Sequence, residues 1–328
     1  MLNSVSNREP PPPAAGGGVV AGVVSGVVPG GSPGAGALPD DAAALAPRMA
    51  MMGGGAALVR GFAPPRAGVR ARNPVTGLET IIGDDERLAV PDASADPWRR
   101  ICQLDLKGRL GNFKGTGWFA GPATVITAGH CVHYPQFFDG WAEEITVSPG
   151  RTGDSFPLGR ARSGWFSTVD VWRDGQNADF DMAAIHLDEP LGNAAGIFPC
   201  RVLDDPALIG RMVNISGYPT DRDLARVQYH HANRIMAVTA RRLFYDIDTV
   251  SGQSGAPVWV QDDPAAAPAC VGIHAYGVPG TPLDLHILAN SAPRFDAEVL
   301  AVIGAWVARD NARLGLAGAQ PVSPWGTT

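Results

Sequence analysis

The 328-residue sequence has no long apolar segment and no dense cluster of Lys or Arg. Its most apolar stretch, residues 16–28, is rich in glycine and ends at Pro29, so we expect no membrane span. The net charge is −6, and without a basic patch the sequence does not favour nucleic acid as a partner. The histidines include no pair with a convincing metal-ligand spacing. We therefore expect no metal and no other cofactor.

Aromatic residues are almost absent from residues 1–68, which are rich in Pro, Gly and Ala. Because such a composition buries little apolar surface, we expect residues 1–79 to be a mostly disordered leader or propeptide. The folded domain is expected at residues 80–310 and a loose tail at residues 311–328.

A secretory signal is not clear, since prolines rather than basic residues precede residues 16–28, although residues 35–37 look like a cleavage site. The leader is therefore either a degenerate signal or a flexible extension. We still expect a secreted or extracytoplasmic protein.

Cysteine is scarce. The four cysteines are an even number, which in an extracellular protein is typical of two disulfides, but buried free thiols are an equally physical alternative. The sequence leaves this open for Cys102, Cys131, Cys200 and Cys270.

Short apolar runs, enriched in β-branched and aromatic residues and separated by Gly, Pro and Asp, fill most of the domain. This spacing predicts an all-β fold of two antiparallel six-stranded barrels, at about residues 95–191 and 197–290. The last strand of the second barrel is expected at residues 285–288. Residues 296–309 have the apolar spacing of a helix with Asp296 as its N-cap.

Residues 252–255 form the motif Gly-Gln-Ser-Gly. Glycines on both sides of Ser254 allow a sharp turn that exposes the hydroxyl and directs the N–H groups of Gly252 and Ser254 to one point, as in an oxyanion hole. By itself, the motif is equally compatible with a polar turn before a strand.

A histidine and an acid complete a pattern for nucleophilic chemistry. His130 ends an apolar run, and an imidazole is the base that activates a serine hydroxyl. Asp181 heads another apolar run and is the expected carboxylate partner, with Asp179 as the alternative.

These motifs resemble those of the chymotrypsin-like serine proteases, in the order His, Asp, Ser with separations of 51 and 73 residues. The resemblance is closest to the bacterial glutamyl endopeptidases and extends from about residue 80 to 306. It is carried by TIIGDDER at 80–87, TGWFAGPATVITAGHC at 116–131, VSPGR at 147–151, ISGYP at 215–219, YDIDT at 245–249, GQSGAPV at 252–258 and GIHAYG at 272–277.

The resemblance implies a chymotrypsin-like fold and peptide hydrolysis through an acyl-enzyme, with His130, Asp181 and Ser254 as the triad. In many relatives the cysteine that follows the catalytic histidine forms a disulfide with an earlier cysteine. The resemblance places Gly115 at that earlier position, so Cys131 lacks the partner that is usual in the family. It also places Gln253 where trypsin-type zymogens have the acid that binds the freed amino terminus.

The same resemblance implies a preference for Glu, with Thr249, His274 and the freed amine of Thr80 binding the substrate carboxylate. A hydroxyl and an imidazolium are chemically suited to this. The alternative is a trypsin-like Lys or Arg preference through Asp248.

Glu79 precedes the segment with which the mature relatives begin, so self-cleavage would release the leader. We expect protein or peptide substrates and a monomer. A non-catalytic binding module is the remaining alternative, but such a module would be expected to have lost a triad residue or glycine.

Overall fold

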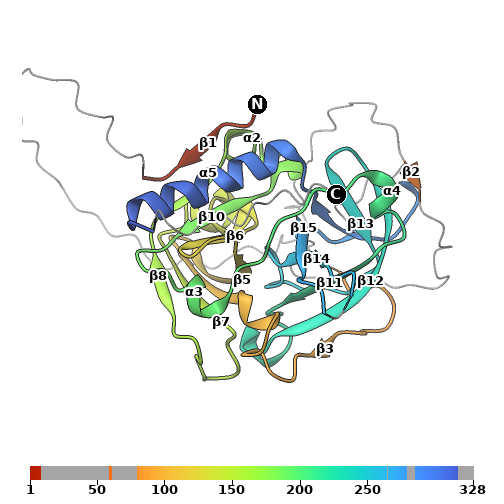
Figure 1. Ribbon diagram of the computed structural model, residues 1–328, viewed down its shortest axis with the longest axis horizontal. Coiled ribbons are helices and arrows are strands. Elements are labelled where there is room, and N and C mark those ends of the chain that lie inside the picture. The colour runs from red at the N-terminus through yellow and green to blue at the C-terminus, as the bar shows by residue number, and fades with distance from the viewer. Residues whose placement is uncertain (9–58, 61–79, 264, 279–284, 317–328) are drawn as a thin grey trace, which may run out of the picture. The chain divides into compact units, whose positions relative to one another are not determined.

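The computed structural model describes residues 1–8, 59–60, 80–263, 265–278 and 285–316 (Figure 1). Most of the predicted disordered leader and of the predicted tail lies outside these residues. The described part is mostly β, in two antiparallel sheets, so the all-β prediction is confirmed. No helix within it is long and apolar enough to cross a membrane.

The first sheet holds the strands nearest the predicted base. Its spatial order is β1 (Ser4–Ser6), β9 (Phe166–Val169), β10 (Ala183–His186), β6 (Thr124–Thr127), β5 (Gly111–Phe119), β4 (Ile101–Gly108), β7 (Glu144–Pro149) and β8 (Ala161–Ser163).

The second sheet carries the predicted nucleophile. Its order is β15 (Ala269–Ile273), β14 (Pro257–Val260), β11 (Met212–Gly217), β12 (Tyr229–Val238), β13 (Arg242–Tyr245) and β16 (Asn290–Pro293), with β2 (Val59–Arg60) and β3 (Leu88–Ala89) paired to β12. Over the described residues each sheet has eight strands rather than six, because short strands such as β1, β2 and β3 add to the longer ones.

One predicted strand was placed wrongly. Residues 285–288 are not a strand, and β16 instead begins at Asn290, which pairs with Tyr245. The alternation of apolar residues suggested a strand, but His286 has φ of 51°, which is incompatible with extended backbone.

The helices are few. Short helical turns lie at α1 (Pro135–Phe138), α2 (Asp170–Gly175), α3 (Gly192–Ala195) and α4 (Asp205–Leu208), with 3₁₀ turns at Trp98–Arg100 and Asp223–Ala225. The predicted C-terminal helix is α5 (Ala297–Arg313), which ends four residues beyond the expected end at residue 309. The Asp296 carboxylate caps it by accepting a hydrogen bond of 2.8 Å from the Val299 N–H.

The helix α5 lies along the first sheet, as Figure 1 shows. Its apolar stripe, including Leu300, Ile303 and Trp306, is buried in the same core as that sheet. This burial explains why the helical spacing was readable in the sequence.

A buried polar network also attaches α5 to the first sheet. His186 Nδ1 lies 2.8 Å from Asp310 Oδ2, and His186 Nε2 lies 2.9 Å from Ser167 Oγ. Arg309 Nη2 donates to the same Nε2 at 2.6 Å. Burial lowers the pKa of His186, so the ring is neutral and carries its proton on Nδ1, facing Asp310.

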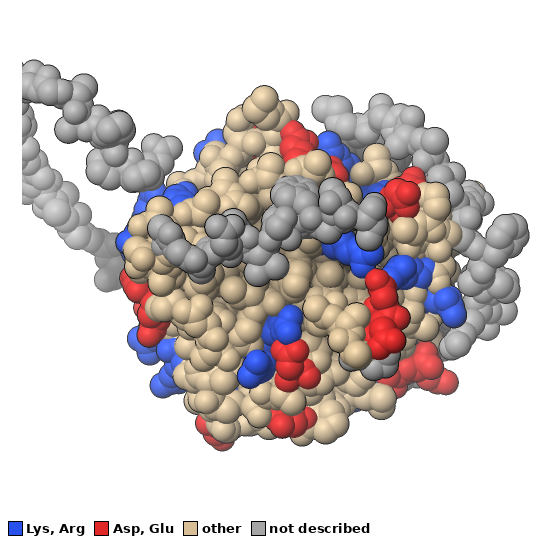
Figure 2. All heavy atoms as spheres, in the orientation of Figure 1, with Lys and Arg blue, Asp and Glu red and all other residues tan. Residues whose placement is uncertain are grey.

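The visible surface mixes charges of both signs. Figure 2 shows Lys and Arg side chains interspersed with Asp and Glu over this face rather than collected in one patch. Exposed ion pairs of the domain include Arg201 with Asp262 and Arg226 with Asp154. Pairs of this kind contribute little to stability individually.

Candidate active site

His130 and Asp181 are brought together by the pairing of β6 with β10. Ala183 lies opposite Thr127, so the turn after β6 (Gly129–Cys131) meets the residue just before β10. Asp181 Oδ2 lies 2.7 Å from His130 Nδ1, and Asp181 Oδ1 accepts a hydrogen bond of 2.9 Å from the His130 N–H. The carboxylate thus fixes both the ring and the backbone of one residue.

The alternative acid, Asp179, has a different role. It lies in a 3₁₀ turn (Ala178–Phe180), where its N–H donates to the capping side chain of Asn177 at 3.0 Å. Asp179 is half-buried, whereas Asp181 is fully buried against His130. The geometry therefore selects Asp181.

Ser254 lies on a tight loop that only glycine permits at two positions. Gly252 and Gly255 have φ of 98° and 86°. A Cβ on Gly255 would lie 2.1 Å from Thr127 Oγ1, and one on Gly252 would lie 2.4 Å from the Tyr218 carbonyl oxygen. The loop therefore packs directly against the end of β6, three residues before His130.

Hydrogen bonds hold this loop to both sheets. The Thr116 N–H, on β5, donates to the Ser254 carbonyl at 2.9 Å, and the Thr116 hydroxyl donates to the Gly252 carbonyl at 2.7 Å. On the other side, the Gly255 N–H donates to the His274 carbonyl at 2.7 Å.

His130 and Ser254 line one cavity of about 210 Å³, together with Leu106, Asn112, Phe113, Lys114, Cys131, Phe137, Thr220, Ser251 and Gly252. His130 Nε2 is buried and has no hydrogen-bond partner among the described residues. The ring nitrogen opposite Asp181 is therefore free to accept a proton in this cavity.

Comparison with known proteins agrees with this geometry. A sequence model of the family described as trypsin matches residues 92–290, more than half of the chain. The chain belongs to the trypsin family. The matched range includes His130, Asp181 and Ser254 and most strands of both sheets.

Two individual proteins of known name are similar to this chain in sequence. A glutamyl endopeptidase of Bacillus licheniformis is 38% identical over 206 residues, which is 62% of this trypsin-family chain and 63% of that protein. An extracellular metalloprotease of Bacillus subtilis is 32% identical over 182 residues, covering 55% of this chain and 57% of that protein. This chain thus spans about three fifths of the length of these curated relatives.

A solved structure of a Glu endopeptidase in complex with MPD matches with a TM-score of 0.61 and 26% identity. The match covers 70% of this trypsin-family chain and 99% of the solved one. The chymotrypsin-like fold predicted from the sequence is thereby confirmed.

His274 follows β15 and is fully buried. Its Nδ1 lies 2.7 Å from the Tyr245 hydroxyl, while its Nε2 has no hydrogen-bond partner among the described residues. Burial, assisted by the charge of His130, lowers the pKa of His274 to about 3. The ring predicted to be an imidazolium is therefore neutral in this structure. If the Tyr245 hydroxyl donates to Nδ1, the proton of the ring is on Nε2.

Thr249 is the second buried residue with an unsatisfied polar atom in this region. Its side chain is fully buried, and Oγ1 has no hydrogen-bond partner among the described residues. Its N–H donates to the Thr80 carbonyl at 3.3 Å. Because buried polar groups normally have partners, unsatisfied atoms of this kind suggest a site for a polar ligand.

Thr80 begins a segment that lies against the residues around Thr249. The Thr80 carbonyl also accepts a hydrogen bond of 2.6 Å from Asn290 Nδ2, and its hydroxyl accepts one of 3.1 Å from the Val278 N–H. We call residues 80–87 the entry segment. The predicted binding residues Thr80 and Thr249 are thus in contact.

Asp248 holds the entry segment rather than facing a ligand. Its Oδ1 accepts from the Ile82 N–H at 2.7 Å and its Oδ2 from the Glu86 N–H at 2.9 Å. Burial raises the pKa of Asp248. With both oxygens engaged by backbone, Asp248 fixes the entry segment beside Thr249.

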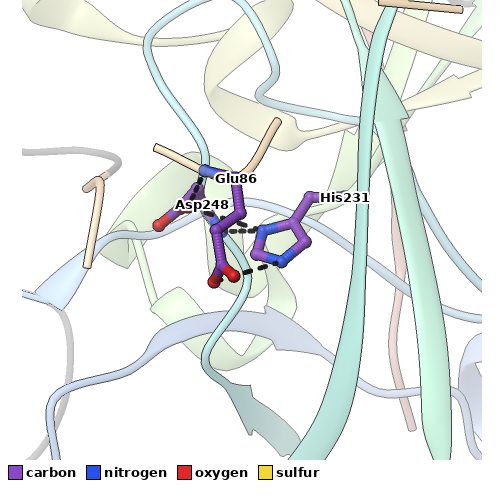
Figure 3. Close-up of side chains that lie close together, drawn as sticks. All are labelled: Glu86, His231 and Asp248. Carbon is purple, nitrogen blue, oxygen red and sulfur yellow. Dashed lines mark hydrogen bonds and ion pairs between the residues drawn. The ribbon is translucent and has the colours of Figure 1, made fainter. Parts of the chain in front are cut away.

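Glu86, His231 and Asp248 bring polar atoms within 4.8 Å of one another, the spacing of a metal site (Figure 3). However, His231 Nδ1 accepts a hydrogen bond of 2.9 Å from the Asp248 N–H. A neutral ring with Nδ1 accepting carries its proton on Nε2, which lies 3.9 Å from Glu86. The arrangement fits a hydrogen-bonded clamp better than a metal site.

Arg87 was not singled out from the sequence, although it joins the entry segment to the nucleophile loop. It is buried, and its guanidinium lies 2.8 Å from Asp85 and 2.7 Å from Asp221. Burial by itself would lower the pKa of Arg87, but the hydrogen bonds and negative charges of Asp85 and Asp221 outweigh this effect and raise the pKa. Arg87 Nη1 also donates to Gln253 Oε1 at 3.4 Å. A cation thus reaches Gln253 from within the chain.

All four cysteines are free thiols in the structure, and Cys131 pairs with no other cysteine. A Cβ built on Gly115 would lie 3.1 Å from Cys131 Sγ. This is about the separation that a disulfide imposes between one Cβ and the far sulfur.

Replacing Gly115 by cysteine should therefore form a disulfide with Cys131 and stabilise the folded state by about 3 kcal/mol, the value expected when a loop of about 15 residues is closed. Intact mass without reductant should fall by the two hydrogens lost, and the melting temperature should drop when reductant is added. Gly115→Ala, which adds the Cβ without the thiol, is the matched control. An equal melting temperature with and without reductant would contradict the expectation.

Proposed function

We propose that this chain is a serine endopeptidase. The observation that carries the proposal is the His130–Asp181 pair, whose free imidazole nitrogen shares a cavity with Ser254 on its glycine-framed loop. His130 Nε2 accepts the Ser254 proton as Oγ attacks the peptide carbonyl carbon. The resulting imidazolium then protonates the leaving amine as the C–N bond breaks, and water hydrolyses the acyl-enzyme by the reverse proton route.

The N–H groups of Gly252 and Ser254 are proposed to stabilise the oxyanion of the tetrahedral intermediate. The positive φ at Gly252 and Gly255 supports this role, since it produces the sharp turn that such an arrangement needs. Loss of one donor of this type lowers transition-state stabilisation by about 3 kcal/mol.

We further propose a preference for Glu, and secondarily Asp, on the acyl side of the cut. His274 Nε2 and the Thr249 hydroxyl are buried donors with no hydrogen-bond partner among the described residues. We propose that one substrate carboxylate accepts a hydrogen bond from each of them. The names of the glutamyl endopeptidase relatives agree with this preference.

The Lys or Arg alternative loses its physical basis in this structure. It required Asp248 to face the substrate, but both of its carboxylate oxygens accept backbone hydrogen bonds from the entry segment. A non-catalytic binding module is also disfavoured, because the chain retains His130, Asp181 and Ser254 and both loop glycines.

The pH dependence of kcat/KM should show an acid limb set by His130. Burial, which disfavours the charged ring, is outweighed by Asp181, so the pKa of His130 lies well above its ordinary value. Since only the neutral ring accepts the serine proton, activity should rise as pH rises through that pKa. Asp181→Asn should move the limb to lower pH, and an unmoved limb would contradict the assignment.

Maturation is proposed to occur by cleavage after Glu79, releasing the amine of Thr80. Glu79 lies outside the described residues, but Thr80 is held beside Thr249. We propose that the enzyme is exported and acts on proteins or peptides as a monomer.

The test is to express the full chain as wild type and as Ser254→Ala and to determine the amino terminus of each. A wild-type start at Thr80 with an uncut variant supports the triad and the Glu preference together. A start after Arg70 or Arg72 that depends on Ser254 would overturn the Glu preference alone. Proteolysis of a peptide library by the Ser254→Ala protein would overturn the triad.

A further inference from the structure

The first residues of the leader form part of the first sheet. Ser4, Val5 and Ser6 pair antiparallel with Val169, Thr168 and Ser167 of β9, in register. Backbone hydrogen bonds extend the pairing at both ends, from the Asp170 N–H to the Asn3 carbonyl at 2.9 Å and from the Asn7 N–H to the Phe166 carbonyl at 3.2 Å. Figure 1 shows β1 beside α2 and α5, although more than 160 residues of sequence separate β1 from either helix.

Side chains from two distant parts of the domain bind this strand. The Trp306 indole, on α5, donates to Ser4 Oγ at 2.7 Å, and the Trp165 indole donates to Ser6 Oγ at 2.9 Å. Ser6 Oγ in turn donates to the Phe166 carbonyl at 2.7 Å. Both serines are therefore recognised individually, not only through their backbone.

Asn7 adds a two-point contact. Its Oδ1 accepts a hydrogen bond of 2.8 Å from the Phe166 N–H, and its Nδ2 donates to the Gly164 carbonyl at 3.0 Å. Leu2 is half-buried and packs against the core of the first sheet. We call the domain residues that contact residues 2–7 the β1 seat: Gly164, Trp165, Phe166, Ser167, Thr168, Val169, Asp170, Glu298 and Trp306.

The β1 seat is separate from the cavity of the candidate active site. None of its residues lines the cavity that holds His130 and Ser254. A strand in the seat therefore leaves that cavity accessible, and cleavage of the leader does not require the strand to leave.

The leader sequence favours release as one fragment. It contains two glutamates, Glu9 and Glu79. Glu9 precedes Pro10, whose ring removes the N–H and constrains the backbone at that bond. The leader also contains Asp40 and Asp41. An enzyme that prefers Glu to Asp, as proposed, cuts first after Glu79 and leaves β1 joined to the remainder of the leader.

The same fragment carries a second strand on the other sheet. In β2, Val59 and Arg60 pair with Val238 and Ala237 of β12. Two attachment points on one fragment bind more tightly than either alone, because binding of the first raises the effective concentration of the second.

We propose that the β1 seat retains the leader after maturation, so that the active enzyme is a two-chain assembly of residues 1–79 and 80–328. This rests on the proposed cleavage after Glu79. The partner of the seat is the chain's own amino-terminal strand, and its place on β9 covers a sheet edge that would otherwise be open to pairing with another chain.

The experiment is to let the purified full chain process itself, separate it by gel filtration under native conditions and measure intact masses across the domain peak. Equimolar amounts of residues 1–79 and 80–328 in one peak are expected. Elution of the leader fragment apart from the domain, or a fragment that begins after Arg8, would overturn the proposal.

Val5→Pro is the disrupting variant, because proline lacks the strand N–H, and Val5→Ile is its matched control. Retention of the leader should weaken on the order of tenfold or more in Val5→Pro and remain unchanged in Val5→Ile. Hydrolysis of a small ester substrate reports whether the Val5→Pro domain is folded. Equal retention in both variants would show that the β1 seat is not what holds the leader.

A second experiment separates failure of the proposed maturation from failure of leader retention, because it cuts the leader with an added protease. In a Ser254→Ala chain, residues 66–72 are replaced by the recognition sequence of a site-specific protease, which then severs the leader without self-processing. Wild type uncut after Glu79 would contradict the proposed maturation. Loss of the severed leader from the Ser254→Ala domain would contradict the retention by the β1 seat, whatever the outcome of self-processing.

Discussion

Replacement of Ser254 by alanine should lower kcat for peptide hydrolysis by on the order of 10⁶-fold, to the level that substrate binding and oxyanion stabilisation provide by themselves. The reason is that the Ser254 hydroxyl is the group proposed to form the acyl-enzyme. His130→Ala should have a similar effect, and the double variant should be no worse, because the two residues act as one unit.

The control for this prediction is Ser251→Ala, since Ser251 lines the same cavity and lies on the same loop. It should retain activity within a few-fold of wild type. Thermal unfolding of each variant checks that the loop is intact. Substantial proteolysis by pure Ser254→Ala protein would contradict the assignment of the nucleophile.

Replacement of His274 by valine should lower kcat/KM for cleavage after Glu by about 10³-fold, the loss typical of removing one partner of a buried charged hydrogen bond. The substrate carboxylate would then enter a buried site without the Nε2 donor. Labelling of Ser254 by a small fluorophosphonate should be much less affected, because that reagent has no carboxylate to bind.

Tyr245→Phe is the matched test of how His274 is held. The substitution preserves the aromatic ring but removes the hydroxyl that lies 2.7 Å from His274 Nδ1. Without it the neutral ring can place its proton on Nδ1 and present a lone pair at Nε2, which repels a carboxylate. Cleavage after Glu should therefore fall while fluorophosphonate labelling persists. An equal loss of both in His274→Val would mean that His274 is structural.

The candidate site residues could be proposed from the sequence because each lies in a short motif whose chemistry is local. Ser254 is framed by glycines, and His130 and Asp181 adjoin the apolar runs that became β6 and β10. The choice of Asp181 over Asp179 required only the prediction of where the strand that became β10 begins, because the expected acid directly precedes that apolar strand.

What the sequence did not reveal depends on contacts between distant segments. Asp248 carries the same carboxylate whether it faces a substrate or the entry segment, and only the contact with Ile82, 166 residues away, decides between them. Arg87 likewise gives no local sign of its link to Gln253. The strand β1 was missed because its composition is polar and its partner β9 is about 160 residues distant.

The network that attaches α5 to the first sheet shows how a search for catalytic triads by side-chain geometry can select a structural site. Ser167, His186 and Asp310 reproduce the connectivity of a nucleophile, base and acid, with 2.8 Å from His186 Nδ1 to the carboxylate, compared with 2.7 Å at His130. Yet Arg309 donates to the nitrogen of His186 that a base would need, whereas the corresponding nitrogen of His130 has no hydrogen-bond partner among the described residues and its ring lines a cavity with Ser254. A search by side-chain template would find two hits in this one chain. An unoccupied base nitrogen at a cavity and a glycine-framed loop, rather than the three side chains, distinguish the proposed nucleophile Ser254 from Ser167.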